Sequence, residues 1–117
     1  MNLLWVILGG GLGAALRWFI ASGISSDGFP YGTFTVNLVG CLLIGGASYF
    51  LLNQPKMSLF LITGFLGGFT TFSSFGLDAV KLLQAENYKT LISYVLLSNV
   101  LGIMLVILGH KLASSIA

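Results

Sequence analysis

The chain has 117 residues, of which 56% are hydrophobic and only 7% are charged. Soluble domains carry about 25% charged residues, so this composition excludes an ordinary soluble globular protein and favours a membrane protein. The formal net charge of +2 is too small to indicate a nucleic-acid partner.

Four apolar segments follow one another along the chain, and each is close to the roughly 20 residues that a spanning helix requires. They cover residues 3–21, 32–52, 58–83 and 91–112. Because the loops between them are short, we expect the helices to pack as neighbours. The sequence therefore predicts an all-α membrane protein, with one four-helix transmembrane domain over residues 1–117.

The first segment places three notable residues on one helix face. Gly9 and Gly13 have the GxxxG spacing that lets two helix backbones approach closely, which favours oligomerisation. Arg17 follows them at the same four-residue interval, so it points to the packed face rather than to lipid. Two interpretations stay open: Arg17 extends its charge to the interface, or it attracts anions into a vestibule.

The second segment contains an amide at membrane depth. Asn37 follows Thr33 by four residues in the stretch GTFTVNLVG, so the two share a helix face. One interpretation is an ordinary interhelical hydrogen bond. The other is that the amide NH2 offers its two donors to an anion or another substrate.

The third segment contains the polar stretch GFLGGFTTFSSFG, which begins at Gly64. Gly67 and Gly68 are adjacent, and the β-branched Thr70 and Thr71 follow soon after, so we predict a helix break near the middle of this segment. A break exposes backbone carbonyls and amides, which must be buried in protein or line a polar cavity. Carbonyl oxygens suit a hard cation.

Two aromatic residues follow the predicted break. Phe72 and Phe75 are three residues apart, so their rings lie on one helix face beside Ser73 and Ser74. The rings could serve packing alone. Alternatively, their electropositive edges could contact a small dehydrated anion.

The fourth segment carries a polar stripe, because Tyr94, Ser98 and Gly102 recur every four residues. This stripe fits interhelical hydrogen bonding or a polar path. The acids Asp78 and Glu86, like the one other acid in the chain, are expected in loops or near segment ends. The sequence contains no catalytic triad, metal-ligand cluster or phosphate loop, so we do not expect an enzyme.

The distribution of charged residues does not favour either orientation of the chain in the membrane. Lys56 and Lys111 fall on one side of the predicted membrane, whereas Lys81 and Lys89 fall on the other. One explanation of this balance is that so small a chain simply carries few charges. The alternative is dual topology, in which oppositely oriented copies pair and supply the inverted repeat of larger transporters.

Several motifs together resemble a known family. The stretches GGGLGAALRW, GTFTVNLVGCLLIG and GFLGGFTTFSSF occur in this order, followed by Tyr94 and Ser98, and they resemble the Fluc (CrcB) fluoride channels over essentially the whole chain. The resemblance implies an antiparallel, dual-topology homodimer with two pores in the inner (plasma) membrane. It also implies passive fluoride export that gives fluoride resistance.

The resemblance further implies roles for particular residues. Main-chain carbonyls of Gly67 and Thr70 from both subunits would hold one structural sodium ion. Ser74 stands where many relatives carry Thr, and both side chains provide a hydroxyl. The pore would be formed by an arginine, an amide, two aromatic rings and several hydroxyl groups: Arg17, Thr33, Asn37, Phe72, Ser73, Ser74, Phe75, Tyr94 and Ser98.

Two other classes of protein remain as alternatives. A small multidrug exporter also has four spans and dual topology, but it should carry a glutamate inside its first span for proton exchange. The first segment here carries Arg17 and no acid. The third class is a membrane scaffold that transports nothing.

Overall fold

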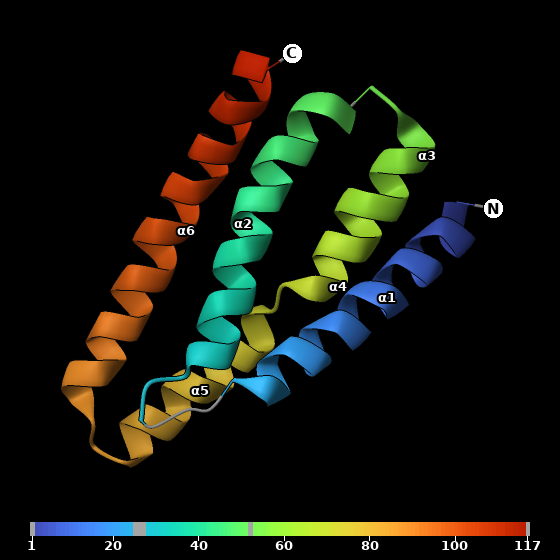
Figure 1. Cartoon of the computed structure of the whole chain (residues 1–117). Coiled ribbons are helices and arrows are strands. Elements are labelled where there is room, and N and C mark those ends of the chain that lie inside the picture. Colours follow the sequence, from blue (N-terminus) through green and yellow to red (C-terminus); the bar gives the residue numbers. More distant parts are fainter. Residues whose placement is uncertain (1, 25–27, 52, 117) are drawn as a thin grey trace.

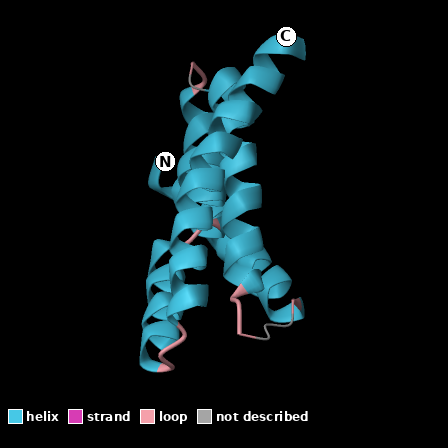
Figure 2. Cartoon of the chain, turned by 90° about the vertical axis from the view of Figure 1, so that its left-hand side faces the viewer, coloured by secondary structure: helices cyan, strands magenta, loops and turns pink. Residues whose placement is uncertain are grey.

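A computed structural model of the chain describes residues 2–24, 28–51 and 53–116, and within these ranges the chain is helical apart from short connections (Figures 1 and 2). The elements are α1 (Asn2–Gly23), α2 (Tyr31–Leu51), α3 (Pro55–Met57), the π-helix η1 (Ser58–Leu66), α4 (Gly67–Phe69), α5 (Phe72–Gln84) and α6 (Tyr88–Ile116).

Four helical segments are long and apolar enough to cross a membrane: Asn2–Gly23, Tyr31–Leu51, Pro55–Gln84 and Tyr88–Ile116. They match the four predicted spans to within a few residues at each end, which confirms the all-helical fold class. The predicted last residue of the second span, Leu52, lies outside the described residues. The segment Pro55–Gln84 joins α3, η1, α4 and α5, and we call it the third span.

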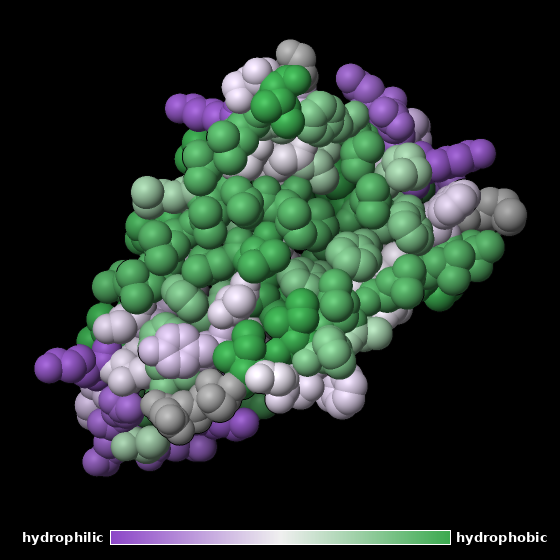
Figure 3. All heavy atoms as spheres, viewed as in Figure 1, coloured by the Kyte–Doolittle hydropathy of each residue, from purple (hydrophilic) through white to green (hydrophobic). Residues whose placement is uncertain are grey.

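The helices form two packed pairs. α6 packs mainly against α2, and α1 packs mainly against η1 and α4, so the first half of the third span lies between α1 and α2 (Figure 1). α5 continues beyond the break and contacts α6. In Figure 3, hydrophilic residues gather at the two ends and a hydrophobic band lies between them. This distribution is the one expected of a chain that spans a bilayer.

Glycines on α1 bring it against the third span. Gly9 and Gly13 are buried, and a Cβ atom on either would collide with the backbone of η1. Gly68 likewise faces the backbone of Gly10. The predicted close approach is therefore confirmed. However, its partner is the third span of the same chain, so this spacing carries no argument for oligomerisation.

This packing predicts opposite outcomes for two alanine substitutions on α1. A Cβ atom on Gly13 would lie 2.9 Å from the Phe65 carbonyl carbon and 2.9 Å from the Phe69 amide nitrogen, whereas a Cβ on Gly11 meets nothing within 4 Å. Gly13→Ala should lower stability by about 1–3 kcal/mol through overpacking. Gly11→Ala should be neutral or stabilise the helix by up to about 1 kcal/mol.

Thermal unfolding of the two purified variants in one detergent tests this contrast, with the parent chain as reference. Equal melting temperatures for Gly13→Ala and Gly11→Ala would show that the close contact between α1 and the third span does not contribute to stability.

The third span is interrupted near its middle, as predicted, but not at the paired glycines. Gly67 and Gly68 are helical, whereas Thr70 (φ −84°, ψ 159°) and Thr71 (φ −151°, ψ 125°) are extended and separate α4 from α5. Gly68 instead permits close packing on α1, where it faces the backbone of Gly10. The break falls where Thr71 turns toward α2. The π-helix before the break was not predicted, and no sequence pattern accounts for it.

Candidate functional site

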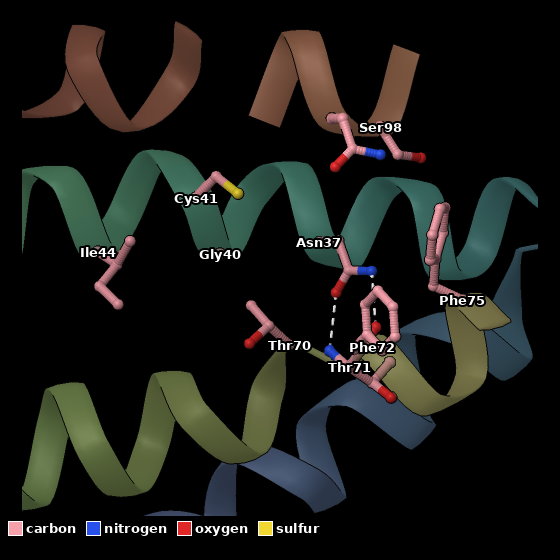
Figure 4. A pocket seen from close by; sticks show the side chains of 10 residues that line it. Asn37, Gly40, Cys41, Ile44, Thr70, Thr71, Phe72, Phe75 and Ser98 are labelled. Carbon is pink, nitrogen blue, oxygen red and sulfur yellow. Dashed lines mark hydrogen bonds between the residues drawn. The ribbon is translucent and has the colours of Figure 1, made fainter. Parts of the chain in front are cut away.

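An amide from α2 holds the broken third span in place. The Asn37 Nδ2 donates to the Thr71 carbonyl over 3.0 Å, and the Thr71 amide nitrogen donates to the Asn37 Oδ1 over 2.8 Å (Figure 4). The side chain therefore pairs with the extended backbone as a neighbouring strand would. One of the two Asn37 donors is used in this way, and the second N–H remains for another acceptor.

The break redirects two backbone amides. In an unbroken helix the Thr71 amide would donate to the Gly67 carbonyl, and the Ser74 amide to the Thr70 carbonyl. Here the Thr71 amide donates to Asn37, and the Ser74 amide donates to the Thr71 Oγ1 over 3.1 Å. Thr71 is thus the N-cap of α5. The carbonyls of Gly67 and Thr70 therefore lose their usual helical donors.

A cavity of about 320 Å³ opens beside the break, and we call it the central cavity. Figure 4 shows side chains from α2, α6 and the third span around it. The Ser98 Oγ is buried and has no hydrogen-bond partner within the described ranges. The cavity is lined by polar and apolar groups together: Asn37, Gly40, Cys41, Ile44, Thr70, Thr71, Phe72, Phe75, Ser98 and Asn99.

The two aromatic side chains on α5 contact each other at this cavity. The ring centroids of Phe72 and Phe75 are 5.7 Å apart and their planes are tilted by 45°. Phe75 continues the contact to Tyr94, 4.9 Å away. Phe72 is 81% exposed in the single chain. This exposure means that packing inside the chain does not account for Phe72.

A second cavity of about 310 Å³ lies on the α1 side of the break, and we call it the arginine cavity. The Arg17 Nε donates to the Gly68 carbonyl over 3.1 Å, so Arg17 points to the packed face, as predicted. Its guanidinium keeps further N–H donors. The lining combines charge, hydroxyls and one indole: Arg17, Trp18, Ala21, Ser22, Thr33, Thr71 and Ser74.

Tyr94 is fully buried and contacts an acid, which the sequence did not predict. Its hydroxyl donates to the Asp78 Oδ2 over 3.2 Å. Asp78 lies on α5, inside the third span, and it is half-buried. The expectation that Asp78 lies in a loop or near a segment end did not include its contact with Tyr94. Its position four residues after Ser74 and three after Phe75 was the available signal.

The predicted pore residues thus fall into two groups, one at each cavity. Thr71 lines both cavities and therefore lies between the two groups. The central cavity holds Asn37, Phe72, Phe75 and Ser98, whereas the arginine cavity holds Arg17, Thr33 and Ser74. Ser73 and Tyr94 line neither of these two cavities.

Ser73 and Tyr94 nevertheless touch residues that do line them. The Ser73 Oγ lies 3.2 Å from the Thr71 Oγ1, and the Tyr94 ring packs on Phe75. The predicted set of pore residues did not include Thr71 and Asn99, although both line the central cavity. Threonine is among the preferred N-cap residues, and this preference was the available signal for Thr71.

Comparison with known proteins agrees with this arrangement. Residues 4–110 match the family described as CrcB-like protein, Camphor Resistance (CrcB). The chain is 46% identical to the Fluoride-specific ion channel FluC of Helicobacter acinonychis (strain Sheeba), covering 98% of both chains.

Other relatives carry the same description. The chain is 46% identical to that of Helicobacter pylori (strain J99 / ATCC 700824), over 98% of this chain and 96% of the relative. It is 41% identical to that of Hydrogenobaculum sp. (strain Y04AAS1), over 96% of this chain and 97% of the relative. The chain described here is therefore a multi-pass membrane protein of the CrcB-like family.

Proposed function

We propose that this chain is a fluoride-selective ion channel that lets fluoride leave the cell passively and so confers fluoride resistance. The observation that carries the proposal is the central cavity, where an amide, a buried hydroxyl and two aromatic rings meet at a broken membrane-spanning helix. The relatives described as fluoride-specific channels cover nearly the whole chain.

The chemistry of the cavity suits a small anion. Fluoride is strongly hydrated, so a pore must replace its water with donors while keeping each site weak enough for the ion to leave. The remaining N–H of Asn37 and the hydroxyl of Ser98 are such donors. The electropositive ring edges of Phe72 and Phe75 add mild attraction. Arg17, Thr33 and Ser74 extend the donor set into the arginine cavity.

Fluoride efflux from liposomes tests the proposal. Liposomes loaded with potassium fluoride and reconstituted with the chain should release fluoride when a potassium ionophore balances the charge, without any proton gradient. Proton-coupled uptake of organic cations in place of fluoride efflux would instead support the exporter, and neither activity would support the scaffold.

We further propose that two copies pair in opposite orientations in the inner (plasma) membrane. In the single chain, Gly67, Phe72 and Ser73 at the break are exposed, although backbone and hydroxyl groups at this depth need protein or water around them. A second chain would cover them. The balanced distribution of lysines over the two ends favours opposite insertion.

Accessibility labelling tests the orientation. Lys56 is exposed at one end of the molecule, so Lys56→Cys should react with a membrane-impermeant maleimide from both faces of the membrane. The parent chain, with its half-buried Cys41, reports background labelling. Labelling of Lys56→Cys from one face alone would rule out dual topology.

A structural sodium ion at the contact between the copies is also part of this proposal. The carbonyls of Gly67 and Thr70 have lost their helical donors, whereas the Gly68 carbonyl accepts from Arg17. Carbonyl oxygens are ligands that suit sodium. When bound, the ion would place positive charge near the pores.

Sodium binding predicts a salt-specific change in stability. The protein should melt at a higher temperature in sodium chloride than in N-methylglucamine chloride, by the equivalent of about 2.7 kcal/mol at a hundred times the dissociation constant. Identical melting temperatures in the two salts would count against the sodium site.

A further inference from the structure

Asn99 is a polar residue deep in α6 that the proposed function has not used. It lies about 16 Å from the start of α6 at 1.5 Å per residue, close to the middle of a hydrocarbon layer about 30 Å thick. Its side chain is exposed in the single chain. An amide facing lipid at this depth is costly, so Asn99 must face protein or a polar space.

The contacts of Asn99 fix the orientation of its amide. The Asn99 Nδ2 donates to the Val95 carbonyl over 2.8 Å. Since a carbonyl only accepts, the nitrogen and not the oxygen of the amide must face Val95. One N–H of the Asn99 amide is therefore bonded to the backbone of its own helix. The second N–H and the Oδ1 have no partner within the described ranges.

The space beside Asn99 is the central cavity. Asn99 lines it together with Ser98 on the same helix and Asn37 on α2. Each of the three has hydrogen-bonding capacity that the described chain leaves unused. Asn37 has one spare N–H, the Ser98 Oγ is buried without a partner, and Asn99 has one spare N–H.

We propose that Asn99 is a second amide donor of the fluoride pore, lining the same cavity as Asn37 and Ser98. This inference rests on the proposed channel function and adds a further pore-lining donor to it. The central cavity would then offer a dehydrated fluoride ion amide donors from two different helices and one hydroxyl along its path. The Val95 contact holds the Asn99 amide so that little side-chain freedom is lost when the ion arrives.

Substitution of Asn99 tests the proposal in the liposome efflux assay. Asn99→Leu keeps the approximate size and removes the donor, and it should slow fluoride efflux about tenfold, the effect of one lost hydrogen bond. Asn99→Ser restores a donor and should be faster than Asn99→Leu. The control is Val100→Leu, because Val100 is the next residue, is 53% exposed and does not line the cavity. Val100→Leu should match the parent chain.

The outcomes separate three cases. If the parent chain releases no fluoride, the proposed function itself fails. If the parent chain releases fluoride and Asn99→Leu matches it, only the role of Asn99 is refuted. In the remaining case Asn99→Leu loses flux, and size-exclusion chromatography decides its cause. If Asn99→Leu and Asn99→Ser both lose flux and both elute differently from the parent chain, Asn99 belongs to the contact between copies. The inference is then wrong. Slow efflux by Asn99→Leu with unchanged elution supports it.

Discussion

Asn37→Asp should reduce fluoride efflux by about 100-fold or more while leaving the chain inserted in the membrane. The carboxylate removes both amide donors and places negative charge in the cavity that the anion must enter. Two like charges about 4 Å apart repel by about 4 kcal/mol at the effective dielectric constant near a protein surface, enough to slow one barrier by several hundred-fold. Efflux from liposomes containing equal amounts of protein measures the loss.

Asn37→Asp also strains the break. A carboxylate oxygen would face the Thr71 carbonyl, which in the parent chain accepts from the Asn37 Nδ2 over 3.0 Å. Asn37→Ala separates the two effects, since it breaks the Thr71 pair without adding charge. We expect Asn37→Ala to be impaired and Asn37→Asp to be impaired further. Equal efflux from the two variants would show that charge in the cavity does not matter, and that Asn37 acts only by holding Thr71.

The positions of the helices followed directly from the sequence. Each span has about the length that a bilayer imposes, and the short loops make neighbours of successive helices. That Asn37 and Ser74 face protein or a polar space was also predictable, because an amide or a hydroxyl at membrane depth must do so. Asn37 lines the central cavity and Ser74 the arginine cavity, and their part in a pore stays a prediction.

The exact place of the break was not predictable by the same reasoning. The paired glycines and the following threonines both have low helix propensity, so the sequence placed the break between residues 67 and 71 without choosing among them. The structure breaks at Thr70 and Thr71, because a distant residue, Asn37, competes for the Thr71 amide. A side chain 34 positions away in the sequence decides this local conformation, and no local pattern records that contact.

The contact of Tyr94 with Asp78 was missed for a similar reason. The sequence places Asp78 near the end of a span, where an acid is ordinarily solvated. The break, however, sets the direction of α5 relative to α6, and α5 brings Asp78 to the Tyr94 hydroxyl. Contacts that depend on the angle between two helices follow from packing and not from spacing along either helix.

Phe72→Ile should slow fluoride efflux about five- to tenfold, although Phe72 is 81% exposed in the single chain and packs little there. An aliphatic side chain keeps much of the bulk but lacks the positive edge of the ring. Interaction with one ring edge is worth about 1 kcal/mol, which corresponds to a change of this size in rate. Because Phe72 is so exposed, the substitution should not disturb the packing of the chain itself.

Phe72→Met is the matched comparison, because methionine is apolar and flexible but has a polarisable sulfur in place of a ring. Slow efflux from both variants, with unchanged elution in size-exclusion chromatography, would assign the effect to the ring edge. Retained efflux in Phe72→Met alone would show that a soft, polarisable group is sufficient. Efflux from Phe72→Ile equal to that of the parent chain would refute a direct contact with fluoride. Phe72 would then serve the contact between copies, for which its ring and that of Phe75, 5.7 Å away, provide an apolar surface.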